Sequence, residues 1–269
     1  MVPVHTTSVV DADDVRLDDY RQLQNHTLRR RVEEAGRFFI VEGWEAVRRL
    51  LASNWEVRSV LLTEDKVHRM GSLFEDDGSF PLYIVSRAVA ERVTGFDVHR
   101  GLLASAGRPK PRDWRKVVTG AGLVAVLEGI NDRENLGAIF RSAAALGVDA
   151  VLLGLEVPDP LSRRSVRVSM GGVLMVPFAG FEAQAGNFED LKAIGFTLVG
   201  LTPDPAAMPI EAVSPVSRVA LLLGSEAGGL SETALHASDI RVRIAQTGRL
   251  DSLNVGHAAA IAFHHFGGS

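Results

Sequence analysis

The stretch Leu123-Val124-Ala125-Val126-Leu127 is apolar at every position, and three further short runs share this property. A strand that is apolar on both faces is typical of a parallel sheet buried between two helical layers. The further runs are residues 150–153, 196–201 and 219–223. Helices are expected between and after the runs, at 136–146, 189–194, 232–237 and 254–266. Residues 120–269 therefore predict an α/β domain whose sheet binds ligands at the C-terminal ends of its strands.

The first part of the chain predicts a smaller α/β domain at residues 16–107. Expected strands at 38–41, 57–63 and 82–85 alternate with expected helices at 17–35, 43–52 and 87–93, the last capped by Ser86. Two prolines among charged residues favour an extended linker, which we place at 108–119. Residues 1–15 are polar and lack the basic start and apolar core of a signal peptide, so we expect a disordered leader.

Composition excludes several classes of protein. Of the 269 residues, 46% are hydrophobic and 23% charged, as in ordinary globular proteins. No apolar run is long enough to predict a membrane span. The absence of cysteine excludes disulfides and thiolate metal sites, and it fits a cytoplasmic protein. The net charge of −4 argues against nucleic-acid binding through bulk charge alone, so any phosphate binding depends on local basic clusters. Such clusters lie at 29–31, 108–116 and 163–167, and each alone is more often a solvated face.

Four loops combine glycine with polar residues, and the weakest of them is Ser169-Met170-Gly171-Gly172, which with Val176-Pro177 predicts a turn before a strand. The loop 131–137 enters a helix that contains Arg141, and we expect Asn135 to cap that helix. In the loop 223–231 glycines allow the backbone to approach a ligand closely, but neither a P-loop nor a dinucleotide fingerprint is present. The third loop, 252–257, enters an alanine-rich helix. Taken singly, each loop is also compatible with an ordinary capped turn.

Taken in order, the loops resemble a known family. Its three motifs match Asn135-Leu136-Gly137-Ala138-Ile139 with Arg141, then Gly224-Ser225-Glu226-Ala227-Gly228-Gly229, then Ser252-Leu253-Asn254-Val255. The family is the SpoU/TrmH branch of the SPOUT RNA 2′-O-ribose methyltransferases, and the resemblance covers residues 120–269. The stretch Phe38-Phe39-Ile40-Val41-Glu42-Gly43 resembles the small L30e-like substrate-binding domain that often precedes it.

The resemblance implies a deep trefoil knot, which general rules of topology would not suggest. It also implies S-adenosylmethionine as cofactor, RNA as partner, and a homodimer with the active site between protomers. Ribosomal RNA is the preferred substrate, and tRNA is the alternative. A catalytically silent RNA-binding or ribosome-assembly protein of the same fold is a further hypothesis. A nicotinamide-dependent enzyme is a third hypothesis, but this sequence lacks the glycine fingerprint that such enzymes carry.

Site residues follow from the matched positions. The catalytic set is Arg141, Asn135, Glu226, Ser252 and Asn254. The cofactor set is Thr202, Leu223, Gly224, Ser225, Gly229, Ile244 and Leu253. The set expected to contact RNA is Arg29, Arg30, Arg31 and Arg37. In the resemblance Asn135 orients Arg141, but a guanidinium stays protonated in proteins, so Arg141 is expected to clamp a phosphate or stabilise an alkoxide.

Two positions depart from the family pattern. Ala245 stands where the family usually has proline, and Gly256-His257 where it often has Ser-Val. Both departures concern the geometry of the cofactor loops. No metal is expected, because His257 and His264 share a helix face without a further ligand at metal spacing.

Overall fold

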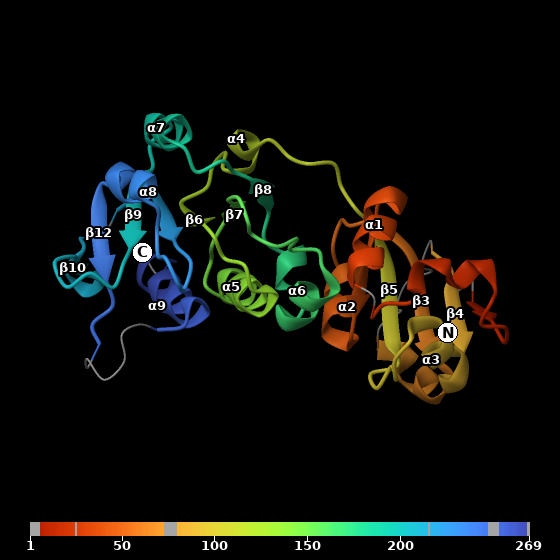
Figure 1. The fold of residues 1–269 in the computed structure, drawn as a ribbon. Helices are drawn as coiled ribbons and strands as arrows, with labels where there is room; N and C mark the ends of the chain where they lie inside the picture. The colour runs from red at the N-terminus through yellow and green to blue at the C-terminus, as the bar shows by residue number, and fades with distance from the viewer. Residues whose placement is uncertain (1–5, 25, 73–79, 215, 247–252, 268–269) are drawn as a thin grey trace. The chain divides into compact units, whose positions relative to one another are not determined.

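The computed structural model describes residues 6–24, 26–72, 80–214, 216–246 and 253–267, which form two units (Figure 1). The first unit comprises Met1–Lys110 together with Leu161–Leu174. The second comprises Pro111–Pro160 and Met175–Ser269. No helix in the described parts of the chain is both long and apolar enough to cross a membrane.

The first unit is built on a five-stranded sheet in the order β1-β4-β3-β5-β2. β5 runs antiparallel to β3 and β2, and the other pairs are parallel. The strands are β1 Thr6–Ser8, β2 Phe38–Glu42, β3 Val57–Thr63, β4 Leu82–Val85 and β5 Leu102–Gly107. The helices are η1 Val15–Tyr20, α1 His26–Gly36, α2 Trp44–Leu51, η2 Glu64–Ser72, α3 Arg87–Thr94, α6 Arg163–Val168 and η3 Gly172–Leu174. The small α/β domain expected from the sequence is present.

The beginning of the chain differs from the sequence-based expectation. Thr6–Ser8 pairs with β4, and Val9 and Ala12 are buried in the apolar core, so residues 6–15 are not a disordered leader. Residues 1–5 lie outside the described residues. The helix expected at 17–35 is broken into η1 and α1, with Gln22 between them in the left-handed region (φ 50°). Two buried apolar residues, Val9 and Ala12, are too few to produce a hydrophobic period in the sequence of residues 6–15.

Residues 161–174 belong to the first unit although they follow strand β7 of the second. The Glu42 carboxylate accepts hydrogen bonds from two residues of α6, Arg163 (2.8 Å) and Arg167 (3.3 Å). Burial lowers the pKa of Arg163, and Glu42 opposes that shift. Trp55 Nε1 donates to the carbonyl oxygen of Leu174 (3.0 Å). Edge strand β2 is thus covered by a segment distant in sequence.

The second unit holds a seven-stranded sheet in the order β10-β12-β9-β11-β6-β7-β8, and every pair is parallel, as expected. Leu223 pairs with Leu127, so the C-terminal ends of the central strands β11 and β6 lie side by side. The strands are β6 Leu123–Leu127, β7 Ala150–Leu153, β8 Phe178–Gly180, β9 Thr197–Leu201, β10 Met208–Pro209, β11 Val219–Leu223 and β12 Ile240–Arg243.

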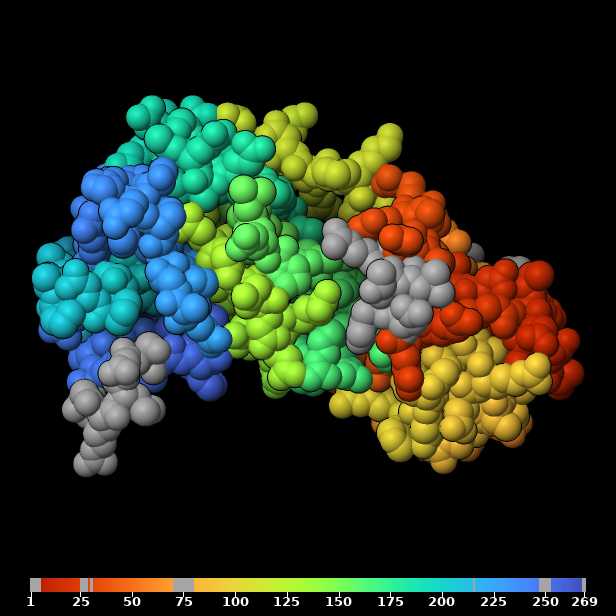
Figure 2. Space-filling model, viewed as in Figure 1, coloured from red at the N-terminus to blue at the C-terminus, as the bar shows by residue number. Residues whose placement is uncertain are grey.

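Helices cover both faces of this sheet. Val124 and Leu222 point into a core shared with α4 Trp114–Val117, α7 Ala185–Ala193 and α8 Glu232–Ala237. α7 and α8 contact each other and adjoin on the surface in Figure 2, where they are blue-green and blue. Alternation along the strands directs the remaining side chains to the other face, where α9 Val255–Gly267 packs on β11 and on α5 Arg133–Ala145. Of the linker expected at 108–119, only residues 108–113 lie outside helices and strands. Helix α4 begins at Trp114, whose side chain is buried in this core.

Candidate active site

Asn254, just before α9, connects the first turn of α5 with the loop that follows β11. Its Oδ1 accepts hydrogen bonds from the backbone N–H groups of Gly256 (3.0 Å) and His257 (3.3 Å), which caps α9. Its Nδ2 donates to Asn135 Oδ1 (2.8 Å) and to Glu226 Oε1 (2.7 Å). Both donors and the acceptor of the amide are used, so only one orientation of the side chain satisfies these partners. Three residues of the predicted catalytic set are therefore in direct contact.

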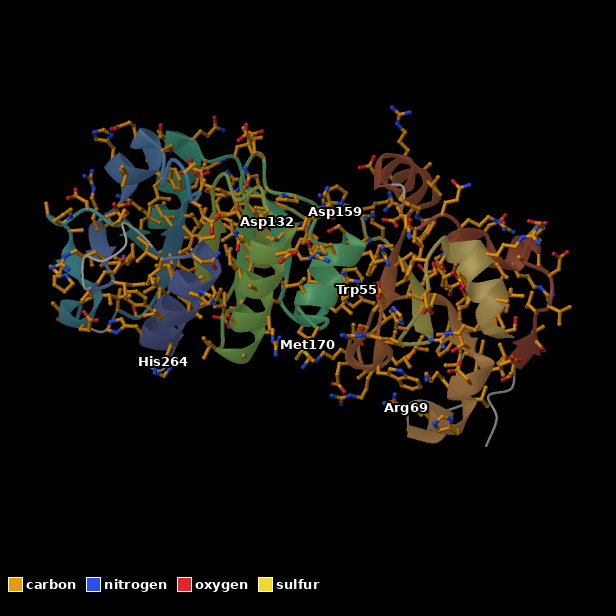
Figure 3. The ribbon with its side chains drawn as sticks, turned by 60° about the horizontal axis from the view of Figure 1, so that its bottom comes forward. Trp55, Arg69, Asp132, Asp159, Met170 and His264 are labelled. Atoms are coloured by element: carbon orange, nitrogen blue, oxygen red, sulfur yellow. The ribbon has the colours of Figure 1, made fainter. Side chains whose placement is uncertain are left out.

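Asn135 does not cap α5, and that expectation is wrong. The cap is Asp132, whose carboxylate accepts from the backbone N–H of Glu134 (2.9 Å) and lies at the start of α5 in Figure 3. A carboxylate at this end also complements the helix dipole. Asn135 instead lies within the first turn, is buried, and directs its side chain to Asn254.

Residues 224–230 form a loop that we call the cofactor loop. Hydrogen bonds between its own backbone groups close this loop. Ser225 and Gly229 exchange two N–H···O hydrogen bonds (3.1 and 2.9 Å). The Ser225 hydroxyl also accepts from the N–H of Gly228 (3.0 Å). A Cβ atom on Gly224 would lie 2.1 Å from the carbonyl carbon of Gly229. This position therefore tolerates no side chain without movement of the loop.

The cofactor loop lines a cavity of about 340 Å³. All seven residues of the predicted cofactor set line it: Thr202, Leu223, Gly224, Ser225, Gly229, Ile244 and Leu253. Ala227, Gly228 and Val255 of the matched motifs also line it, and sequence reasoning missed further lining residues: Leu201, Pro203, Leu230, Leu235, Gln246 and Ala258. Most of these are apolar, and nothing in the sequence distinguishes an apolar cavity wall from an ordinary core residue.

The remaining catalytic candidates have different surroundings. The side chain of Arg141 is exposed on α5, and its guanidinium makes no hydrogen bond or ion pair with any other residue that the structure describes. No hydrogen bond joins it to Asn135 within that part of the chain, so the orienting role of Asn135 stays a prediction. Ser252 lies outside the described residues.

The departures from the family pattern can be located. A Cβ atom on Gly256 would lie 3.1 Å from Cβ of Ala138, so glycine allows α9 to approach α5 closely. Ala245 is exposed next to Ile244 in the cavity wall. His257 and His264 are exposed, with His264 near the end of α9 in Figure 3. Across the described residues, no three His, Asp or Glu side chains are grouped to hold a metal.

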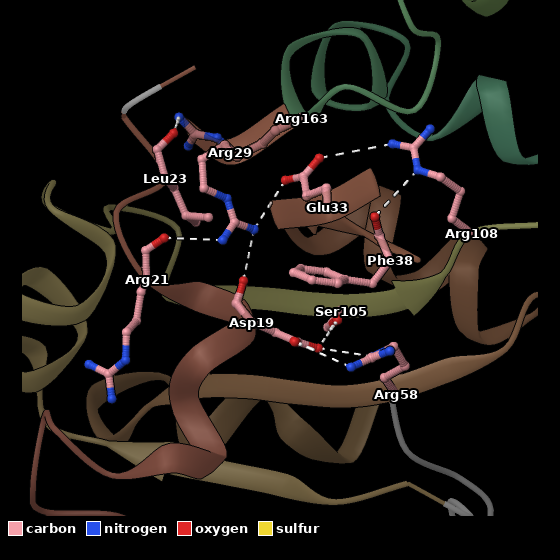
Figure 4. Close-up of polar contacts among 10 residues, drawn as sticks. All are labelled: Asp19, Arg21, Leu23, Arg29, Glu33, Phe38, Arg58, Ser105, Arg108 and Arg163. Atoms are coloured by element: carbon pink, nitrogen blue, oxygen red, sulfur yellow. Dashed lines mark hydrogen bonds and ion pairs between the residues drawn. The ribbon is translucent and has the colours of Figure 1, made fainter. Parts of the chain in front are cut away.

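Arg29 was expected to contact RNA, and the structure corrects this. The residue is only 5% exposed. The guanidinium donates to the carbonyl oxygens of Asp19 (2.9 Å) and Arg21 (3.1 Å) and to the Glu33 carboxylate (3.1 Å), as Figure 4 shows. Arg29 is therefore a structural residue that joins η1 to α1.

The other members of that set have different surroundings. Arg31 is exposed on α1. Arg37 is also exposed and donates to the carbonyl oxygen of Arg108 (3.1 Å). The side chain of Arg30 lies outside the described part. RNA contact by these three residues stays a prediction.

Two family models match this chain. The model described as the SpoU rRNA Methylase family matches residues 122–264. The model described as RNA 2'-O ribose methyltransferase substrate binding matches residues 40–112. Together they span the two domains that the sequence motifs resemble.

Individual proteins are similar over nearly the whole chain. A protein of Mycobacterium tuberculosis named as an uncharacterized tRNA/rRNA methyltransferase is 44% identical and aligns with 96% of this chain and 93% of its own length. The 23S rRNA (guanosine(2553)-2'-O)-methyltransferase RlmP of Bacillus subtilis is 26% identical, over 97% of this chain and 99% of its own. The crystal structure of an AdoMet-bound rRNA methyltransferase from Sinorhizobium meliloti superposes with a TM-score of 0.78 at 25% identity, over 97% of each chain.

Proposed function

The chain belongs to the SpoU rRNA methylase family, and we propose that it transfers a methyl group from S-adenosylmethionine to a ribose 2′-hydroxyl of ribosomal RNA. One observation carries the proposal: the contact of Asn254 with Asn135 and Glu226 at the wall of the cavity that the predicted cofactor residues line. Ribosomal RNA is preferred because RlmP of Bacillus subtilis and RlmB of Nitrosomonas europaea are named for 23S rRNA. A tRNA substrate is the alternative, since the mycobacterial relative is named for both.

The cavity fits a nucleoside cofactor. Its volume of about 340 Å³ falls in the range of small-molecule sites. Leu223, Leu253 and Ile244 provide apolar walls for a base, while the bare backbone at Gly224 allows close approach of a ligand. S-adenosylmethionine, when bound, supplies an electrophilic methyl group carried on a sulfonium sulfur. Asn254 holds the cofactor loop against α5 through Glu226 and Asn135, which prepares the cavity before binding.

Arg141 is the residue assigned to the RNA. Its exposed guanidinium has no partner among the described residues, so a phosphate or a developing alkoxide can take that place. Because the group stays protonated, its role is to bind negative charge rather than to accept the proton. We further infer that the protein is a homodimer in which Arg141 acts on the cavity of the other protomer. Light scattering after size exclusion tests whether the dimer forms. The trefoil knot and a cytoplasmic location are also expected.

Transfer of tritium from labelled S-adenosylmethionine to total RNA tests the activity. The wild type is expected to label RNA, and Arg141→Ala to lose transfer while binding the cofactor with nearly unchanged affinity in isothermal titration. Arg115→Ala is the control, because this exposed arginine of the same unit already pairs with Asp190. Loss of cofactor affinity in Arg141→Ala would contradict the division of roles. RNA binding without any transfer by the wild type would instead indicate a silent RNA-binding protein.

Mapping of 2′-O-methyl groups in RNA from cells with and without the gene identifies the substrate. A site that disappears from ribosomal RNA supports the preferred proposal. A site that disappears only from tRNA supports the alternative.

A further inference from the structure

The cofactor loop, residues 224–230, must keep its shape for the cavity to exist. It begins after Leu223, the last residue of β11, and ends before Ser231, which caps α8 through a hydrogen bond from Ala234 N–H to its hydroxyl (3.1 Å). The internal bonds between Ser225 and Gly229 close the loop on itself but do not attach it to the sheet. The attachment must come from residues outside the loop.

A single residue bonds to both flanks of the loop. The backbone N–H of Glu128 donates to the carbonyl oxygen of Leu223 (2.9 Å), and the Glu128 Oε2 atom accepts from the backbone N–H of Ser231 (2.8 Å). Glu128 directly follows β6, whose last residue Leu127 pairs with Leu223. The sheet register therefore places the carboxylate where the chain leaves the cofactor loop.

The neighbouring residue supports the same contact. Gly129 has φ +66°, and a Cβ atom there would lie 3.3 Å from Cβ of Ser225. The backbone after Glu128 thus passes directly against the cofactor loop. Together with the bond from Asn254 to Glu226, the loop is held at both flanks and near its middle. Glu128 itself does not line the cavity.

We infer that Glu128 is a positioning residue for cofactor binding, which it supports by tying both flanks of the cofactor loop to the end of β6. The inference rests on the proposed function, in which this cavity receives S-adenosylmethionine. Removal of the carboxylate leaves the backbone bond to Leu223 but frees the Ser231 flank. The loop then samples other conformations, and part of the binding free energy is spent on ordering it.

The test compares Glu128→Ala with Glu128→Gln, because the glutamine oxygen can still accept from Ser231 N–H. We expect Glu128→Ala to bind S-adenosylmethionine about tenfold more weakly, the effect of losing one hydrogen bond to a charged group. The KM for the cofactor should rise accordingly, with kcat and the KM for RNA nearly unchanged. Glu128→Gln should stay within about threefold of the wild type. Glu182→Ala, an exposed carboxylate of the same unit outside the cavity, is the matched control.

A second measurement needs no cofactor. Hydrogen exchange at the Ser231 amide should be faster in Glu128→Ala than in the wild type or Glu128→Gln. Unchanged cofactor affinity in Glu128→Ala overturns the inference, as does a loss of kcat and melting temperature with KM unchanged, which indicates a purely structural role. Failure of the wild type to bind S-adenosylmethionine overturns the proposed function instead, while the exchange experiment still decides whether Glu128 holds the loop.

Discussion

Replacing Asn254 by aspartate separates the two tasks of this side chain. An aspartate caps a helix as well as asparagine does, so the start of α9 should be preserved. The substitution instead removes the donors to Asn135 and Glu226 and places an oxygen against each acceptor. The expected result of Asn254→Asp is therefore a loss of stability that does not originate in the helix cap.

The magnitude follows from the contacts. The bond from Asn254 to the Glu226 carboxylate contributes about 1.5 kcal/mol as a hydrogen bond to a charged group. Two carboxylates about 4 Å apart repel by about 1 kcal/mol in a water-like dielectric, the appropriate limit because both residues are exposed. The added charge at the helix N-terminus returns about 0.5 kcal/mol. Loss of the bond to Asn135 adds about 1 kcal/mol, so we expect Asn254→Asp to lower the free energy of unfolding by about 3 kcal/mol.

Urea denaturation of the cofactor-free protein at neutral pH measures this change. The double variant Asn254→Asp with Glu226→Gln removes one carboxylate and supplies an amide donor, so it should recover about 1 kcal/mol or more. A single variant as stable as the wild type would refute the reasoning. So would a double variant no more stable than the single one.

Three further substitutions test other parts of the structure. Gly224→Ala should abolish cofactor binding in isothermal titration, because the new Cβ atom would overlap the backbone of Gly229. Gly186→Ala is the control, since a Cβ atom there meets nothing within 4 Å. Equal binding by both variants would contradict the close approach. Arg29→Met should lower the unfolding free energy by about 3 kcal/mol in urea denaturation, because the carbonyl oxygens of Asp19 and Arg21 and the buried Glu33 carboxylate each lose a hydrogen bond from a charged donor. An unchanged midpoint would contradict its structural role. Hydrogen bonds from Arg16 lower the pKa of Asp14 from 3.8 to about 2. The contribution of the Asp14 carboxylate to folding stability is therefore complete above about pH 4 and lost as the pH falls through 2. NMR titration of Asp14 should show that midpoint, and Arg16→Gln should return it toward 3.8.

The central strands of the second unit could be predicted because burial on both faces requires apolar residues at every position. Leu123–Leu127 and Val219–Leu223 are apolar at every position, and the structure has them as β6 and β11 with the expected bounds. β10, with two residues, was missed because so short a strand carries no period. β5, at Leu102–Gly107, was missed because small residues dilute its apolar pattern.

The candidate site could be predicted only in part. The ordered motifs identified Asn135, Glu226 and Asn254, and these residues are in contact. The role of Asn135 was misplaced because asparagine is also a common cap, and Asp132 three positions earlier takes that role. Glu128 was missed altogether, since an acidic residue after a buried strand has no distinctive spacing. Its significance depends on the register between β6 and β11, which only the folded chain reveals.

The covering of β2 by residues 161–174 has a consequence during synthesis. A ribosome that has released the chain up to Lys110 has delivered Glu42 but neither of its arginine partners, Arg163 and Arg167. At that stage the segment that covers β2 is still missing, so the Glu42 carboxylate stays open to water and the first unit is incomplete. The order in which the segments leave the ribosome is therefore not the order in which the units can be completed. For the same reason, a chimera that exchanges the first unit between relatives must also carry Leu161–Leu174 from the same parent.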